Sequence, residues 1–420
     1  MFKQAKVGFI ALCLLIGTSL QGASGSHERI AAAEKQPFPD IANHWAKESI
    51  LKAAESGLVE GYPDGTFKPD AVVSGDQFVS MMLRAFSDGG ENFDQGWLDQ
   101  LMYVQPGFIG PIRSAVIENK FKFQNAKSGY WAKPFIDMLY DMDVMMTFDP
   151  VFPKDYALYK KQITRDRASY LLGKWFTTLE TNFDAAYSEY VRSNSGLVDM
   201  GSSINSAASG YRATALIAGL MRGWNNHFYP NRYVTRAEAL TMVQRLRDSS
   251  LRDPYKPNLK GQLYVELEGQ IYLYSDKYKY DSYKKIVELA KKHVTSGYVG
   301  VGNLGVIIFD SRESFDKHDF LTRLGDFSNL PAIEFGLTVA DGNSSYLSMV
   351  YPRNKKYPHS TTLVDAAFEL FAGDSKGTQL KSKVFAMEKY LTTKAVEFSF
   401  NNRDFKAYVA GELIRLERLY

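Results

Sequence analysis

The sequence predicts a multidomain protein in which a mostly helical N-terminal half precedes a C-terminal α+β domain. Three observations support this prediction. The length of 420 residues corresponds to two or three domains of about 150 residues each. Apolar residues three and four positions apart, which are typical of helices, recur through the first half. Alternation with a period of two, which is typical of strands, begins only after residue 258.

Composition and charge place the chain among ordinary globular proteins. Hydrophobic residues make up 45% of the chain and charged residues 23%, which excludes bulk disorder and collagen-like repetition. The 50 Lys and Arg residues exceed the 47 Asp and Glu residues, and the formal net charge is +3. Because this balance does not drive the whole protein toward nucleic acid, nucleic acid is not an expected partner. Any anion must be bound at local sites.

The N-terminus predicts export. Lys3 and Lys6 precede an apolar run at residues 7–16 and a stretch of small residues at 17–26. That order is typical of a secretory signal peptide, here residues 1–25. Its apolar core is shorter than the roughly 20 residues of a spanning helix, and no later segment is apolar for long enough. We therefore expect no membrane insertion after the signal is cleaved.

Cysteine usage agrees with export. The only cysteine, Cys13, lies within the signal peptide, so the mature chain has none. An exported protein without disulfide bonds is more typical of a Gram-positive bacterium than of an animal secretory pathway. We therefore expect a secreted protein of a Gram-positive cell.

Three similar units follow, and the clearest spans residues 38–86. Its apolar residues recur at helical spacing until Gly57 ends the helix. Residues 63–65, Pro-Asp-Gly, are typical turn residues. A second helix begins after Ser74, which forms a capping box with Gln77. The unit is therefore predicted to be a helix, a turn and a capped helix.

The same capped helix recurs twice along the chain. Thr164 and Thr235 each follow a β-branched residue, as Ser74 does, and each precedes an apolar stripe with spacing i, i+3, i+4, i+7. The three stripes are Phe78, Met81, Met82 and Ala85; Ala168, Leu171, Leu172 and Trp175; and Ala239, Met242, Val243 and Leu246. Three matching stripes indicate an internal repeat whose helices pack on one core.

At these residues the chain resembles the S-layer homology family. The first unit matches that family's pattern from F-x-D through H-W-A to G-L-V-x-G-Y-P-D-G-T-F-x-P. The third unit keeps T-R-A-E at residues 235–238, and the second keeps Trp131 and Ala132 together with Thr164 and Arg165. In that family three repeats interleave into one pseudo-threefold, mostly helical module. The resemblance implies the same module here.

The resemblance also divides the first half of the chain. It gives a first repeat, an insertion, a second repeat and a third repeat at residues 38–86, 87–122, 123–176 and 197–248. The second repeat lacks Pro-Asp-Gly and its turn region looks longer, while the start of the third repeat looks degenerate. A polar linker at residues 249–258 follows the repeats.

A candidate binding site lies where the second helix of a repeat begins. Arg165 and Arg236 directly follow the capping residues Thr164 and Thr235. Free N–H groups and the positive end of the helix dipole favour an anion at that position, and a guanidinium adds a planar fork suited to a carboxylate. The resemblance to S-layer homology repeats implies which carboxylate: a pyruvyl ketal on a secondary cell-wall polysaccharide, bound in grooves between repeats.

The remaining candidates are aromatic residues and a changed position. Trp45, Trp131 and Trp224 could stack on sugar rings, although an aromatic residue at a helix start or turn is more often part of a core. In the first repeat Gly75 replaces the arginine and Asp76 follows it. Because a carboxylate opposes an anion, we expect this position to keep its cap and to bind ligand weakly or not at all.

The second half, residues 259–420, predicts an α+β domain that resembles no family we recognise. The expected order is β-α-β-α-β-β-α-α-β-α. Strands are expected near residues 263–268, 306–309, 333–339 and 346–350, helices at 282–293, 361–372 and 378–391, and a last helix after Asp404. Asp341 and Gly342 are expected to form a hairpin turn between two strands.

No catalytic constellation is visible in that domain. His293, His318 and His359 lack metal-ligand spacing, and no G-x-S-x-G motif occurs. Residues 300–305 read G-x-G-x-x-G but lead into a strand instead of a helix, so no dinucleotide site is expected. We predict no metal, no cofactor and no catalytic residues.

The resulting hypothesis is a non-catalytic protein at the cell wall and cell surface. Its repeats would bind the wall polysaccharide and display the C-terminal domain. A wall-anchored enzyme acting on glycan or peptide through residues 259–420 is the alternative. A third possibility is an adhesion or assembly domain with surface-layer partners.

Overall fold

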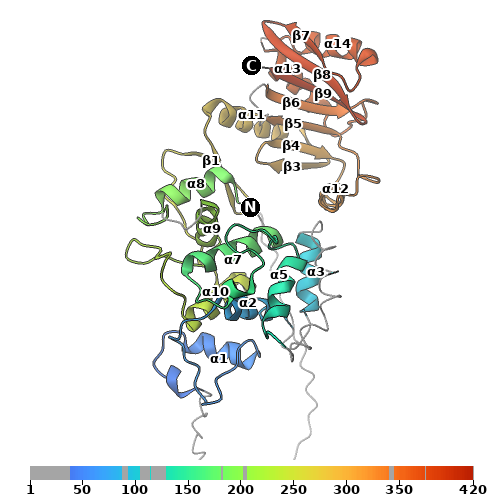
Figure 1. The fold of residues 1–420 in the computed structure, drawn as a ribbon. Helices are drawn as coiled ribbons and strands as arrows, with labels where there is room; N and C mark the ends of the chain where they lie inside the picture. Colours follow the sequence, from blue (N-terminus) through green and yellow to red (C-terminus); the bar gives the residue numbers. More distant parts are fainter. Residues whose placement is uncertain are drawn as a thin grey trace, which may run out of the picture. The chain divides into compact units, whose positions relative to one another are not determined.

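The computed structural model of the chain describes residues 38–87, 93–104, 114, 129–180, 183–201, 206–339, 345–373 and 375–419 (Figure 1). The predicted signal peptide, the turn at Asp341 and Gly342, and most of the predicted insertion lie outside these residues. In the part that is described, no helix is long and apolar enough to cross a membrane.

The N-terminal half is helical, as predicted. Helices α1 and α2 belong to the first repeat, α5, α6 and α7 to the second, and α9 and α10 to the third. Their bounds are Lys47–Glu55, Gly75–Arg84, Lys133–Asp141, Tyr156–Tyr159, Arg165–Leu179, Ser206–Ile217 and Arg236–Arg247. The other helical segments here are η1 (Pro39–Ile41), α3 (Gln95–Val104), α8 (Ala185–Asn194) and η3 (Ser249–Leu251).

The three predicted capping residues begin the helices on which the repeats are built. Ser74, Thr164 and Thr235 are the N-caps of α2, α7 and α10, and all three have an extended backbone. The capping boxes of Ser74 with Gln77 and of Thr235 with Glu238 are both present. The capped helices therefore begin where the local sequence pattern places them.

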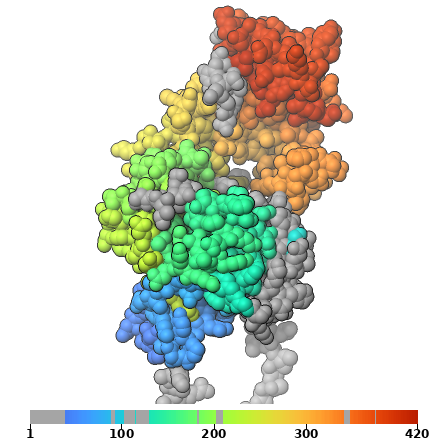
Figure 2. All heavy atoms as spheres, in the orientation of Figure 1, coloured from blue at the N-terminus to red at the C-terminus, as the bar shows by residue number. Residues whose placement is uncertain are grey.

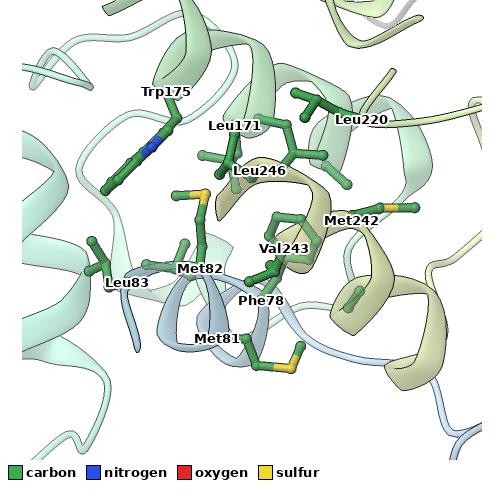
Figure 3. Close-up of a cluster of buried hydrophobic side chains, with 14 of the residues drawn as sticks. Phe78, Met81, Met82, Leu83, Leu171, Trp175, Leu220, Met242, Val243 and Leu246 are labelled. Carbon is green, nitrogen blue, oxygen red and sulfur yellow. The ribbon is translucent and has the colours of Figure 1, made fainter. Parts of the chain in front are cut away.

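Helices α2, α7 and α10 bury their predicted apolar stripes in one core (Figure 3). Phe78, Leu171 and Val243 point toward one another from the three helices and are all essentially inaccessible to solvent. Trp97 of α3 adds to this core, because its ring lies 4.7 Å from that of Phe86 and 6.0 Å from that of Trp175. Part of the predicted insertion thus completes the core of the repeats.

The segments just before the three caps pair with one another in a closed ring. The N–H of Val73 donates to the carbonyl of Val234, that of Val234 to Ile163, and that of Ile163 back to Val73, each at 3.0 Å. Residues far apart in the sequence therefore lie side by side, and Figure 2 shows yellow-green atoms of the third repeat within the blue surface of the first. Each repeat completes its backbone hydrogen bonds with both of the others.

The C-terminal half contains a seven-stranded antiparallel sheet in the order β3-β4-β5-β6-β9-β8-β7. These strands are Tyr298–Gly302, Gly305–Phe309, Phe335–Val339, Ser345–Pro352, Leu413–Leu419, Arg403–Ala410 and Val396–Phe400. A separate hairpin, β1 (Leu263–Leu267) and β2 (Gln270–Tyr274), precedes the sheet. The helices are α11 (Lys277–His293), α12 (Arg312–Leu324), α13 (Thr361–Ala372) and α14 (Gly377–Met387), with the short η4 (Glu388–Tyr390).

One face of this sheet forms the second core. Leu337, Met349 and Leu416 lie in this core and are fully buried, because successive side chains of a strand point to opposite faces. Ile286 of α11 and Phe368 of α13 pack against them. The α+β class predicted for this half is therefore correct.

The predicted C-terminal helix is wrong. The residues after Asp404 form strands β8 and β9, which are joined at Gly411 with a φ of 62°. Asn401 and Asn402 have φ values of 52° and 56°, a left-handed backbone that suits a tight hairpin turn between β7 and β8. The period-two alternation after this turn outweighs the single capping signal at Asp404.

Candidate functional site

All three repeats have a turn that ends on a buried phenylalanine before the second helix, although its backbone differs: Gly65 has a positive φ in the first repeat, and Asn225 and Asn226 both do in the third. Each has a buried phenylalanine preceded three positions earlier by aspartate or asparagine: Asp64 and Phe67, Asp149 and Phe152, Asn225 and Phe228. Seven positions separate this phenylalanine from the capping residue in the first and third repeats, but twelve do so in the second. The five additional positions accommodate helix α6. The second repeat therefore keeps the turn and is longer only after it.

A carboxylate from the start of the repeat holds the turn in the first and third repeats. The contacts are Asp40 with the N–H groups of Phe67 and Lys68, at 2.9 and 2.7 Å, and Asp199 with those of Phe228 and Tyr229, at 2.6 and 2.8 Å. The start of the third repeat, which looks degenerate in sequence, therefore keeps the aspartate that holds the turn. An apolar-x-Asp signal at residues 197–199 matches the first repeat and could have found it.

Arg236 extends from the start of α10 onto the turn of the first repeat. Its Nη2 donates to the carbonyl of Glu60 at 2.5 Å, and its Nη1 lies 3.5 Å from the hydroxyl of Tyr62. The guanidinium is 4.9 Å from the ring centroid of Tyr62 and 4.6 Å from that of Phe67. The side chain is half-buried, and within the described residues its Nε has no hydrogen-bond partner. One donor of this fork is therefore unused.

A second cation stands at the same turn. The ammonium of Lys68 lies 4.3 Å from the ring centroid of Tyr62 and 2.9 Å from the carboxylate of Asp64. Hydrogen bonds from Thr66, followed by Lys68, hold the pKa of Asp64 well below its usual value, so this carboxylate stays ionised. Tyr62 therefore has an arginine and a lysine close to its ring.

Arg165 contacts the turn of the third repeat in the corresponding way but is buried. Its Nε donates to the carbonyl of Phe228 at 2.8 Å and its Nη2 to that of Arg222 at 2.6 Å. Only 3% of the residue is exposed, and burial lowers the pKa of its guanidinium to about 10. Both donors point to protein carbonyls, so this arginine holds the second and third repeats together.

The three tryptophans have different surroundings. Trp224 stacks on Tyr229 at 4.2 Å, and the guanidinium groups of Arg165 and Arg232 lie 4.7 and 5.0 Å from its ring centroid. Protein groups therefore contact its ring, and 39% of the surface of this residue remains exposed. Trp45 and Trp131 are 65% and 43% exposed. Within the described residues, neither has a recorded ring or hydrogen-bond contact with Arg165 or Arg236.

The expected free N–H groups at the helix starts are not free. The first two amides of α7 and α10 donate to carbonyls of a neighbouring repeat: Arg165 to Arg232, Asp166 to Pro230, Arg236 to Ala71 and Ala237 to Pro69, at 2.8–2.9 Å. The hydroxyls of Thr164 and Thr235 accept from the third amide of each helix. This part of the prediction is wrong, because contacts between repeats satisfy the donors. An anion would have to use the guanidinium.

The corresponding position of the first repeat is filled by the second repeat. A Cβ atom on Gly75 would lie 3.0 Å from the carbonyl oxygen of Tyr159, a fully buried residue of α6. The hydroxyl of Tyr130 donates to the Oδ2 of Asp76 at 2.7 Å, and Asp76 is itself buried. No arginine side chain could take this position without moving α6.

The C-terminal domain has a cavity of about 1070 Å³ beside α11, α13 and α14. Its lining includes Lys285, His293, Asp365, Glu369, Lys381 and Arg403. Lys381 pairs with Asp365 at 2.6 Å, and Arg403 donates to the carbonyl of Phe371 at 2.9 Å. In the described part of the chain, no cluster of three or more His, Cys, Asp or Glu side chains could hold a metal ion.

Residues 37–79 and 213–240 match the model of the S-layer homology domain. The chain contains S-layer homology domains. The first match extends from the start of the first S-layer homology repeat into α2, and the second extends from α9 into α10. The second repeat lies outside both matches, so its assignment rests on its cap and turn and on the ring of hydrogen bonds.

Three curated relatives are similar to parts of this chain. The cell surface glycoprotein 1 of Acetivibrio thermocellus is 42% identical over 61 residues, which are 14% of this chain and 3% of the relative. The cellulosome-anchoring protein of the same bacterium is 28% identical over 98 residues, 23% and 16% of the two chains. The amylopullulanase of Thermoanaerobacterium thermosulfurigenes is 24% identical over 237 residues, 56% and 11%. The chain spans at most 16% of the length of these three relatives.

Proposed function

We propose that this protein is an exported surface protein, anchored non-covalently to the wall of a Gram-positive cell by a pseudo-threefold module of three S-layer homology repeats. The family matches in the first and third repeats support this function. So do two relatives whose names are cell surface glycoprotein and cellulosome-anchoring protein. The predicted signal peptide would bring the protein outside the membrane. The α+β domain would then be displayed at the surface.

The ligand that we propose is the pyruvyl ketal of a secondary cell-wall polysaccharide, bound at Arg236. The observation that supports this most is the Nε of Arg236, which is buried and has no partner within the described residues. A buried donor without a partner costs free energy, and a carboxylate that accepts from it removes that cost. Lys68 supplies a second positive charge beside Tyr62.

The other predicted site residues have supporting positions in this proposal. Thr235 and Thr164 fix the helix starts that carry Arg236 and Arg165. Trp45 and Trp131, which are the more exposed tryptophans, would offer flat faces to sugar rings farther along the polymer. Trp224 and Arg165 lie at the equivalent junction between the second and third repeats, where the guanidinium already donates to protein carbonyls, and we assign them a structural role.

The test is binding of the mature protein to purified walls. Arg236→Ala should weaken binding about 10- to 100-fold, because a charge-assisted hydrogen bond contributes roughly 1.5–3 kcal/mol. Arg236→Lys keeps the charge but loses the fork, so it should bind at an intermediate level. Arg312→Ala removes an exposed arginine of α12 and should leave binding unchanged. Equal binding to walls stripped of the polysaccharide would refute the proposed ligand.

A wall-anchored enzyme remains the second candidate because of the cavity in the C-terminal domain. Asp365 and Glu369 lie one helical turn apart on α13, and both line this cavity. Two carboxylates can serve as acid and base in glycan hydrolysis. Release of sugars or peptides from walls, lost in Asp365→Asn and Glu369→Gln variants, would support this function. The same rate in all variants would exclude these residues as catalysts.

A further inference from the structure

We infer that the module binds one carboxylate per chain, at Arg236, because the chain's own residues close the two equivalent positions. This inference rests on the proposed function. Three junctions between repeats are compared here. Each junction is named by the first residue of its capped helix. The Arg236 junction faces the turn of the first repeat. The Arg165 junction faces the turn of the third repeat, and the Gly75 junction faces the turn of the second.

The Gly75 junction is filled by α6 and by tyrosines. The five positions that the second repeat adds after its turn place the carbonyl oxygen of Tyr159 only 3.0 Å from where a Cβ atom on Gly75 would lie, which is too close without a shift of the backbone. Tyr159 is fully buried and its hydroxyl lies 2.9 Å from that of Tyr140, so it cannot move aside cheaply. The carboxylate of Asp76, already bound by Tyr130, would repel a second anion. Lys160 lies 4.5 Å from the ring centroid of Tyr130, but this junction has no arginine and no space beside Gly75 for one.

The Arg165 junction has an arginine, but a ligand cannot reach its guanidinium. The Nε and Nη2 of Arg165 both donate to the third repeat, and 3% of the residue is exposed. Trp224 and Arg232 lie over the same place, with the guanidinium of Arg232 5.0 Å from the tryptophan ring. A carboxylate would have to displace protein carbonyls from Arg165 and move Trp224. Both changes reduce its affinity.

The Arg236 junction differs at two of these positions. Tyr62 follows Gly61 in the first repeat as Trp224 follows Gly223 in the third, although Trp224 lies one position closer to the buried phenylalanine. Four positions after the buried phenylalanine the first repeat has Ala71, where the third repeat has Arg232. No guanidinium therefore stands opposite Arg236, which is only half-buried and keeps its Nε without a partner among the described residues. The Nε of Arg232 at the Arg165 junction also has no partner among the described residues, but its guanidinium is paired with Glu238. The Arg236 junction is therefore distinguished by its access and by the second cation, Lys68, beside Tyr62.

Stoichiometry tests this inference directly. The probe is a short oligosaccharide with a single pyruvyl ketal, titrated calorimetrically into the full mature chain. We expect one site per chain, and at least about a tenfold loss of affinity in Arg236→Ala. A stoichiometry of two or three would overturn the inference. If the parent chain does not bind the probe, or binds the oligosaccharide without the ketal equally well, the proposed function fails instead.

Variants at the closed junctions provide the controls. Arg165→Met and Tyr130→Phe should both keep one site with an affinity within about twofold of the parent. A loss of binding sites in a folded Arg165→Met protein would overturn the inference. Circular dichroism checks that each variant folds. If Arg165→Met does not fold, Tyr130→Phe still tests whether the Gly75 junction contributes to binding.

A double variant tests the cause of closure. Arg232→Ala together with Trp224→Tyr gives the third repeat the residues that the first has at Ala71 and Tyr62. We expect a second site to appear, with the stoichiometry rising from one to two. A folded double variant that still binds one probe would refute Trp224 and Arg232 as the groups that close the Arg165 junction.

Discussion

At the scale of single residues, two arginines at the same helix position have different surroundings. Arg165 and Arg236 both follow a capping threonine and both reach the turn of another repeat. The covering residues differ, because Arg232 and Trp224 stand over Arg165 while Ala71 and Tyr62 are the equivalents at Arg236. A pattern along one helix predicts where each arginine begins. The exposure of each arginine depends on residues of another repeat, and these residues are not part of the local pattern.

Arg165→Ala should destabilise the module more than Arg236→Ala does. Arg165→Ala loses two hydrogen bonds and leaves the buried carbonyl of Phe228 and the part-buried carbonyl of Arg222 without this donor, which should cost about 2 kcal/mol. Arg236 is half-buried and loses one short hydrogen bond, which should cost about 1 kcal/mol. Unfolding in urea measures both values. Equal losses, or a larger loss in Arg236→Ala, would contradict the roles assigned to the two side chains.

The buried tyrosines of the second repeat should make the module sensitive to alkali. Burial raises the pKa of Tyr140 to about 12, and burial also raises the pKa values of Tyr159 and Tyr170. The unfolded chain releases these protons near pH 10, so the stability they contribute is complete below pH 10 and falls as the pH rises toward 12.

The measurement is the urea midpoint at several pH values between 9 and 12. Tyr140→Phe should give a shallower decline than the parent, whatever its stability at pH 8. The lowered pKa of Arg165 has the opposite sign, since the unfolded chain keeps that proton longer and stability rises above pH 10. The difference between parent and Tyr140→Phe is therefore the quantity to compare. An identical slope would exclude Tyr140 as a contributor.

At the scale of secondary-structure elements, the caps of the second helices separate stability from binding. Thr235→Ala removes the hydroxyl that accepts from Glu238 N–H and should cost about 1 kcal/mol of stability. Its effect on wall binding should be smaller than that of Arg236→Ala, because the guanidinium remains. Thr235→Ser keeps the hydroxyl and is the control. A Thr235→Ala protein with unchanged stability would show that contacts with neighbouring repeats alone fix the start of α10.

The elements that the sequence predicts well are those with a complete local signal. Ser74, Thr164 and Thr235 were identified as caps because each stands before an apolar stripe, and the predicted helix at residues 361–372 matches α13. The last strands are not predicted, because a capping signal at Asp404 competes with the alternation after it. The asparagine pair at 401 and 402 is the turn signal that could have corrected this.

The candidate site was predictable only in part, for a physical reason. The arginines and caps follow from residues that are neighbours in the sequence. The carbonyls that occupy the first amides of α7 and α10 belong to other repeats, as does the carbonyl of Tyr159 against Gly75. Pairing between distant segments decides which donors remain free, and one sequence does not reveal that pairing.

At the scale of the whole molecule, the two large cores share no buried residues, and a small third cluster around Tyr187 and Val191 packs against Ile271 and Leu273 of the β1–β2 hairpin. One large core consists of the repeats and helix α3, and the other of the seven-stranded sheet with α11, α13 and α14. We expect two calorimetric unfolding transitions. A ketal-bearing oligosaccharide at 100 times its dissociation constant should stabilise only the transition of the repeats, by about 2.7 kcal/mol. A shift in both transitions, or a single transition, would show that the two cores unfold together.

Attachment to the wall should be reversible. Because the proposed contact consists of hydrogen bonds and charge, concentrated urea or guanidinium chloride should release the intact protein from purified walls. The molecular mass of the released protein should equal that of the mature chain. Recovery only after enzymatic wall digestion would indicate a covalent link instead.

The contact between Arg236 and Tyr62 joins residues 174 positions apart. A polymer held there touches the first and the last repeat at the same time. Drag on the displayed domain pulls on the chain after the last repeat, while the polymer restrains the first repeat as well. The load is then shared across the ring of backbone hydrogen bonds and acts on them together instead of one repeat after another. Under flow, such a module would resist being pulled apart repeat by repeat, because bonds loaded in parallel must all break before one repeat separates from the others.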